Sequence, residues 1–122
     1  MKNVFLIFIG GGLGSTLRYS ISCFFIKNQQ NQFPWSTFVV NGLGCLLIGA
    51  IIGYFQKNNL QNDSLKLILS VGFCGGFTTF SALSLENFQF IQNQQYNLAL
   101  SYTITTLVIG LLAVYAGFKI SN

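Results

Sequence analysis

The polar residues of greatest chemical interest in this 122-residue chain lie inside long apolar runs. The densest group is Gly75-Gly76-Phe77-Thr78-Thr79-Phe80-Ser81, where two adjacent glycines precede three hydroxyl side chains. Glycine weakens a helix, and serine and threonine hydroxyls compete for backbone hydrogen bonds. We therefore expect the helix to break here and to free carbonyl oxygens that can coordinate a small ion. An intact helix whose glycines pack against a neighbour is the alternative.

Three more polar side chains lie within apolar runs. The Asn41 amide has two N–H donors, and burying them unpaired in lipid costs several kcal/mol. Asn41 must therefore meet another helix or a polar cavity. Arg18 marks either a vestibule that attracts anions or a buried structural pair. Glu86 follows the expected break by about two turns, and we expect it near a wet vestibule, because deep burial of a carboxylate demands a donor.

Tyr102 and Thr106 are four residues apart and therefore share one face of a helix. With them, the polar inventory of the apolar runs consists mainly of neutral donors and aromatic rings. A cation transporter needs an acidic residue among its helices, whereas an anion pathway needs donors and the positive edges of rings. The chain has no histidine, no nucleophile with a base and no cluster of metal-ligand spacing, so nothing indicates an enzyme.

The elements that carry these residues are membrane-spanning helices. Charged residues form 7% of the chain and hydrophobic residues 52%, against roughly 25% charged residues in soluble domains. The net charge of +4 comes without a basic cluster, which excludes nucleic-acid binding. Four runs reach the ~20 residues that cross a bilayer. They are Val4–Ile26, Trp35–Phe55, Leu65–Ile91 and Leu98–Ile120.

The sequence therefore predicts an all-α, multi-pass protein of the cell's inner (plasma) membrane, with one transmembrane domain over residues 1–122 and a third helix broken near 75–79. The lysines also indicate its orientation. Four of them fall on the side of the N-terminus and one on the other, which favours an N-terminus in the cytoplasm. The four are Lys2, Lys57, Lys66 and Lys119, and the single one is Lys27.

Runs in all four predicted spans resemble the Fluc (CrcB) fluoride channels, over essentially the whole chain. The runs are residues 11–19 (GGLGSTLRY), residues 35–37 (WST) through 41–44 (NGLG), residues 75–81 (GGFTTFS) with Glu86, and residues 110–114 (GLLAV). The GGFTTFS run in the third of four short spans is the most specific of these.

This resemblance implies an antiparallel dimer of four-helix subunits of the dual-topology type, with two pores through which fluoride leaves the cytoplasm passively. It also implies a central structural sodium ion on the dimer axis, held by the backbone carbonyls of Gly75 and Thr78. The positions that match the family's pore are Asn41, Phe80, Ser81, Leu83, Tyr102 and Thr106, with Arg18 and Glu86 as vestibule positions.

One position departs from the family pattern. The family usually has a second phenylalanine one turn after the first, and Leu83 stands there in this chain. This loss of a ring edge and the four-to-one lysine bias raise the hypothesis that the chain forms a heterodimer with an oppositely oriented paralogue. A homodimer is the other possibility.

Two other classes of function compete with a fluoride channel. A small multidrug-type cation transporter has a similar length, but it needs a carboxylate in its first span, where this chain has Arg18 and no acid. A non-conducting membrane assembly subunit would use every glycine and hydroxyl for packing, and it predicts an intact third helix.

Overall fold

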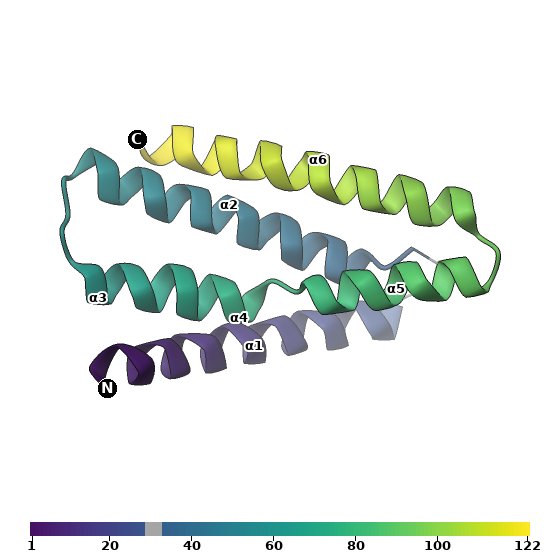
Figure 1. Cartoon of the computed structure of the whole chain (residues 1–122), viewed down its shortest axis with the longest axis horizontal. Helices are drawn as coiled ribbons and strands as arrows, with labels where there is room; N and C mark the ends of the chain where they lie inside the picture. The colour runs from purple at the N-terminus through teal and green to yellow at the C-terminus, as the bar shows by residue number, and fades with distance from the viewer. Residues whose placement is uncertain (29–32) are drawn as a thin grey trace.

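The computed structural model of the chain describes residues 1–28 and 33–122. Within these residues all regular elements are helical, and four helices are long and apolar enough to cross a membrane. The predicted all-α membrane architecture with four spans is confirmed. Figure 1 shows the spans as long rods lying side by side, with the two chain termini and the turn between the second and third spans at one end.

Three of the spans are single helices, and the third consists of four segments. The single helices are α1 (Lys2–Asn28), α2 (Trp35–Lys57) and α6 (Tyr96–Ser121). The segments of the third span are α3 (Asp63–Lys66), the π-helical η1 (Leu67–Cys74), α4 (Gly75–Phe77) and α5 (Phe80–Gln92).

The third span is broken at Thr78 and Thr79, as the sequence predicts. Both residues are extended, Thr78 with ψ 159° and Thr79 with φ −147° and ψ 113°, and the thin link between α4 and α5 is visible in Figure 1. Their hydroxyls make hydrogen bonds that cap the end of α4 and the start of α5. Thr78 Oγ1 donates to the Cys74 carbonyl at 2.9 Å, and Thr79 Oγ1 accepts from the Ala82 N–H at 3.2 Å. The β-branched threonines thus favour the extended backbone and also cap it.

Small residues allow the helices to pack with backbones in contact. A Cβ atom on Gly49 of α2 would collide with the Val114 carbonyl of α6, and one on Gly117 of α6 would collide with the Leu46 carbonyl of α2. On the other side of the bundle, a Cβ on Gly14 of α1 would collide with the Phe73 carbonyl of η1. This close approach is the usual way in which membrane helices gain packing energy without a hydrophobic effect between them.

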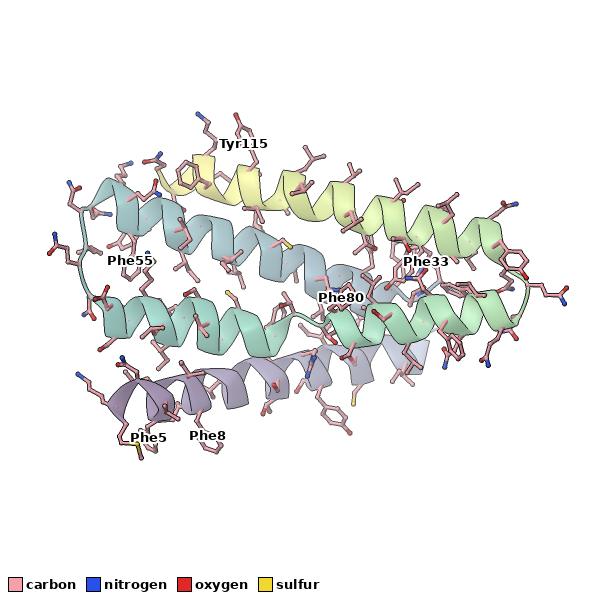
Figure 2. The ribbon with its side chains drawn as sticks, viewed as in Figure 1. Phe5, Phe8, Phe33, Phe55, Phe80 and Tyr115 are labelled. Atoms are coloured by element: carbon pink, nitrogen blue, oxygen red, sulfur yellow. The ribbon has the colours of Figure 1, made fainter. Side chains whose placement is uncertain are left out.

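The outward faces of the bundle are apolar. Phe5 and Phe8 point away from α1 and Tyr115 from α6 (Figure 2), and these side chains are 63%, 76% and 62% exposed. One buried cluster lies at the end of the bundle where α2 and α6 begin: Leu83, Phe90, Ala99 and Tyr102, with Phe33, Phe38 and Leu98 packed against it.

The close contact of α2 with α6 predicts that Gly49→Ala destabilises the fold. The added methyl group overlaps the Val114 backbone, and overpacking of this kind typically costs about 1–3 kcal/mol. Gly12→Ala is the matched control, because a Cβ there meets nothing within 4 Å. The purified protein is unfolded in a detergent titration and followed by circular dichroism. Gly49→Ala should unfold at a lower detergent concentration than the wild type, and Gly12→Ala at the same concentration. Equal midpoints would contradict the packing role of Gly49.

Candidate functional site

The Asn41 side chain holds the break in the third span. Its Oδ1 accepts from the Thr79 N–H at 2.7 Å, and its Nδ2 donates to the Thr79 carbonyl at 3.1 Å. Both backbone groups of one extended residue are therefore satisfied by one amide side chain from α2. The expectation that Asn41 meets another helix or a polar cavity is confirmed in its first form, because its partner is the third span. Asn41 also lines a cavity, which is mainly apolar.

The bonds at Thr79 free two carbonyl oxygens in front of it. In an unbroken helix the Gly75 carbonyl accepts from the N–H of Thr79, and the Thr78 carbonyl from the N–H of Ala82. Here the Thr79 N–H donates to Asn41 and the Ala82 N–H donates to Thr79 Oγ1. Gly75 and Thr78 therefore lose their helical donors, and both residues line the same cavity.

A cavity of about 450 Å³ brings together six of the residues that the sequence singles out. They are Asn41, Gly75, Thr78, Phe80, Leu83 and Thr106. Phe80 lies beside the break (Figure 2) with its side chain 79% exposed. The Thr106 hydroxyl is buried and has no hydrogen-bond partner among the described residues. We call this space the large cavity, to distinguish it from the smaller one between α1, α2 and the break; it is walled mainly by α2, the third span and α6.

A second cavity, of about 220 Å³, lies between α1, α2 and the break, and Arg18 lines it. The guanidinium of Arg18 donates to the Thr78 carbonyl at 3.5 Å, and Ser15 Oγ donates to the Gly76 carbonyl at 3.3 Å. Helix α1 thus contributes donors to carbonyls next to the break, while α2 contributes Asn41. We call this space the small cavity; its other lining residues are Ser15, Tyr19, Ser22, Thr37, Val40, Thr79 and Ala82.

The Glu86 carboxylate joins three helices. Thr37 Oγ1 of α2 donates to its Oε1 at 2.5 Å, and the Tyr102 hydroxyl of α6 donates to its Oε2 at 2.7 Å. Thr37 is 7% exposed and Tyr102 is fully buried. Hydroxyl donors at both oxygens stabilise an ionised carboxylate away from water. We call these three residues the carboxylate cluster, and Thr37 connects it to the small cavity.

The predicted site residues therefore divide between places. Tyr102 and Thr106 share a face of α6, but Tyr102 reaches Glu86 while Thr106 borders the large cavity. Ser81 is exposed on α5, and its hydroxyl shares a 3.2 Å hydrogen bond with Thr79 Oγ1. Leu83 borders the large cavity and is nevertheless 7% exposed, as part of the buried cluster.

Sequence reasoning missed two contributors, Thr37 and Ser15. Thr37 lies four residues before Asn41, so both project from one face of α2. That spacing, together with the need of Glu86 for hydrogen-bond donors, could have indicated Thr37 as a site residue. Ser15 has a weaker signal: it lies one position after Gly14, in a helix whose glycines bring it close to the third span.

The carboxylate cluster predicts that Thr37→Val lowers stability. Valine keeps the shape but leaves Glu86 with one hydroxyl donor, and leaving a buried polar atom without its hydrogen-bond partner costs about 1–3 kcal/mol. Thr105→Val is the matched control, because the exposed Thr105 hydroxyl donates only within its own helix, to the Ser101 carbonyl. The same detergent titration measures both variants. A Thr37→Val protein as stable as Thr105→Val would show that this bond contributes nothing.

Comparison with known sequences places these features in a family. A family model described as CrcB-like protein, Camphor Resistance (CrcB), matches residues 5–118. The chain is 46% identical over 122 residues to a protein of Flavobacterium psychrophilum and 43% identical over 122 residues to one of Azobacteroides pseudotrichonymphae. In each case the alignment covers 100% of this chain and 98% of the relative.

A protein of Phocaeicola vulgatus is 42% identical over 122 residues, with 100% of both chains aligned. All three relatives carry the name "Fluoride-specific ion channel FluC", which describes an ion channel rather than an enzyme. With the model match over nearly the whole length, this chain belongs to the CrcB family of membrane proteins, whose named relatives are fluoride-specific ion channels.

Proposed function

We propose that this protein is a passive, fluoride-selective channel that lets fluoride leave the cytoplasm across the inner membrane. The observation that carries the proposal is the large cavity at the broken third span, where Asn41 and Thr106 bring neutral donors to a mainly apolar lining that contains no carboxylate. The names of the relatives support the choice of ion. Fluoride that enters as neutral acid and dissociates inside runs out down its own gradient, so no energy source is required.

Neutral donors suit fluoride because it is small and strongly hydrated. An amide or hydroxyl can replace one water of its shell, while a weak multi-site path still lets the ion leave. Asn41 uses one of its two amide N–H groups on Thr79, and the second is the donor for the ion. Thr106 contributes its unpartnered hydroxyl, and Phe80 contributes the positive edge of its ring. Ser81 and Leu83 border this path on α5.

The polar groups on the opposite side of the break form the vestibule. Arg18 raises the local anion concentration in the small cavity, and Thr37 connects that cavity to Glu86 and Tyr102. The Glu86 carboxylate accepts one hydrogen bond from each of the Thr37 and Tyr102 hydroxyls. Tyr102 therefore contributes to the pathway through the carboxylate cluster rather than through the large cavity.

A second subunit closes the large cavity in this proposal. Phe80 is 79% exposed and Leu111 is 74% exposed, although both line a cavity that contains the polar Asn41. An antiparallel partner that covers this face gives two equivalent pores per dimer. The partner is a second copy of this chain or an oppositely oriented paralogue, and Leu83 in place of a phenylalanine is the feature that keeps the paralogue in consideration.

The freed carbonyls of Gly75 and Thr78 fit a structural sodium ion. Backbone oxygens are ligands that hard cations accept, and these two have lost their helical donors to Asn41 and Thr79. The Thr78 carbonyl oxygen accepts a hydrogen bond from Arg18. Because a carbonyl oxygen has two lone pairs, the second can still coordinate a sodium ion. Two carbonyls from each subunit would hold the ion on the dimer axis, and its charge would offset the exposed negative ends of the carbonyl dipoles.

The break in the third span weighs against the non-conducting assembly subunit, which predicts an intact helix there. The large cavity gives no support to a cation transporter either, because none of its lining residues is acidic.

The channel proposal predicts rapid fluoride efflux and no chloride efflux from liposomes that contain this chain alone. Phe80→Leu should lower the fluoride rate about tenfold, equivalent to about 1.4 kcal/mol in the barrier, because it removes the ring edge. Phe88→Leu is the control, since Phe88 is 56% exposed on the same helix. Chloride flux equal to fluoride flux would reject selectivity, and a folded but silent protein that conducts only with a paralogue would reject the homodimer.

The sodium proposal predicts that sodium chloride stabilises the dimer in detergent in a saturable manner. A ligand that binds only the folded state raises stability with its concentration, so the unfolding temperature should rise with sodium. N-methylglucamine chloride at equal ionic strength should leave it unchanged. Unfolding temperatures that follow ionic strength alone would show that the Gly75 and Thr78 carbonyls hold no sodium.

A further inference from the structure

An aromatic cluster at the start of α2 contacts the buried Tyr102 through Phe33. The Phe33 ring centroid lies 4.6 Å from that of Trp35, 5.6 Å from that of Phe38 and 5.2 Å from that of Tyr102. Its contacts with Phe38 and Tyr102 are edge-to-face, with interplanar angles of 70° and 81°. Figure 2 shows Phe33 between α6 and α5, beside the start of α2. Edge-to-face pairs of this kind are worth about 0.5–1.5 kcal/mol each beyond the area they bury.

The backbone holds Phe33 in this place. Pro34, the chain's one proline, has φ −81° and ψ 69°, and the Trp35 N–H donates to the Phe33 carbonyl at 2.9 Å. This is an inverse γ-turn, to which proline's fixed φ is suited. The Pro34 carbonyl in turn accepts from the Phe38 N–H at 3.1 Å as α2 begins. Phe33 is thus attached to the first turn of α2 with little freedom, since a residue before proline is itself restricted.

Two rings from different elements hold Tyr102. Phe90 contacts it edge-to-face with centroids 6.0 Å apart. Phe90 is four residues after Glu86, so it lies on the same face of α5 as the carboxylate and fixes Tyr102 relative to α5. Phe33, which directly precedes α2, makes the other contact. The Glu86 carboxylate already joins Thr37 of α2 to Tyr102 of α6 by hydrogen bonds. The Phe33 ring therefore adds a second, apolar contact that fixes α2 relative to α6.

We propose that Phe33 is a positioning residue for the carboxylate cluster: its ring fixes the tilt of the Tyr102 phenol so that the hydroxyl reaches Glu86. Its effect on ion flux rests on the proposed channel function, whereas its effect on Tyr102 does not. The proposal requires the edge-to-face ring contact and not only the volume of the side chain. Leucine separates the two, since it fills much of the same space without an aromatic ring.

The first test observes Tyr102 directly and needs no conduction. The chain has five tyrosines, of which Tyr102 is fully buried and the others are at least half exposed. Fluorine NMR of the detergent-purified protein labelled with fluorotyrosine should therefore give Tyr102 a distinct resonance, assigned with Tyr102→Phe. Phe33→Leu should shift or broaden that resonance, and Phe88→Leu should leave it in place. An unmoved resonance in Phe33→Leu would overturn the proposal.

The second test asks whether Phe33 acts through the Tyr102 hydroxyl. Phe33→Leu should lower fluoride efflux from liposomes several-fold, and Phe33→Tyr should recover it. In the Tyr102→Phe background, Phe33→Leu should have almost no further effect, because coupled residues give non-additive changes. Fully additive losses would mean that Phe33 affects flux by another route and would overturn its positioning role. If the wild-type protein moves no fluoride, the channel proposal fails, and the NMR result still decides the contact.

Discussion

Two hydrogen bonds between the Asn41 amide and the backbone of Thr79 hold the structure in its broken form. In hydrocarbon an unpaired backbone group costs several kcal/mol, and water is not available to satisfy it. One side chain that accepts from the N–H and donates to the carbonyl of the same residue removes both penalties at once. The break, the two freed carbonyls and the start of α5 follow from this pairing. The facing direction of Glu86 follows as well, because it is set by where α5 begins.

That pairing depends on how closely α2 approaches the third span. Gly44 lies three residues after Asn41 and faces the break, and a Cβ atom on it would collide with the Thr78 side chain. The glycines of α1 have a similar effect, since a Cβ on Gly14 would overlap the Phe73 backbone. Close contact on both sides brings the short side chains Asn41 and Ser15 within reach of backbone atoms. The glycines and the polar residues are thus parts of one arrangement rather than separate packing and site features.

The sequence predicted the architecture and the break because both depend on local properties. Span length and apolar content define the helices, and two glycines followed by β-branched residues disfavour a continuous helix. It also predicted that Asn41 needs a partner. It did not predict the partner of Glu86, because Thr37 reaches the carboxylate only through the rotation of α2 about its own axis. That rotation depends on contacts along the whole helix. For the same reason Tyr102 and Thr106 reach different places although their four-residue spacing puts them on one face of α6.

The π-helical segment η1 lies directly before the break, and it constrains how this family member can change in length. Wide turns bond each residue to the fifth along the chain rather than the fourth, so η1 sets the angle at which α4 leaves it. Removing or adding one residue within Leu67–Cys74 would rotate α4 about the helix axis. Gly76, which abuts the Gly11 backbone, would then face elsewhere. A one-residue change of length within η1 therefore changes which residue of α4 faces α1, whereas a substitution that keeps the length and spares the tightly packed Gly72 does not.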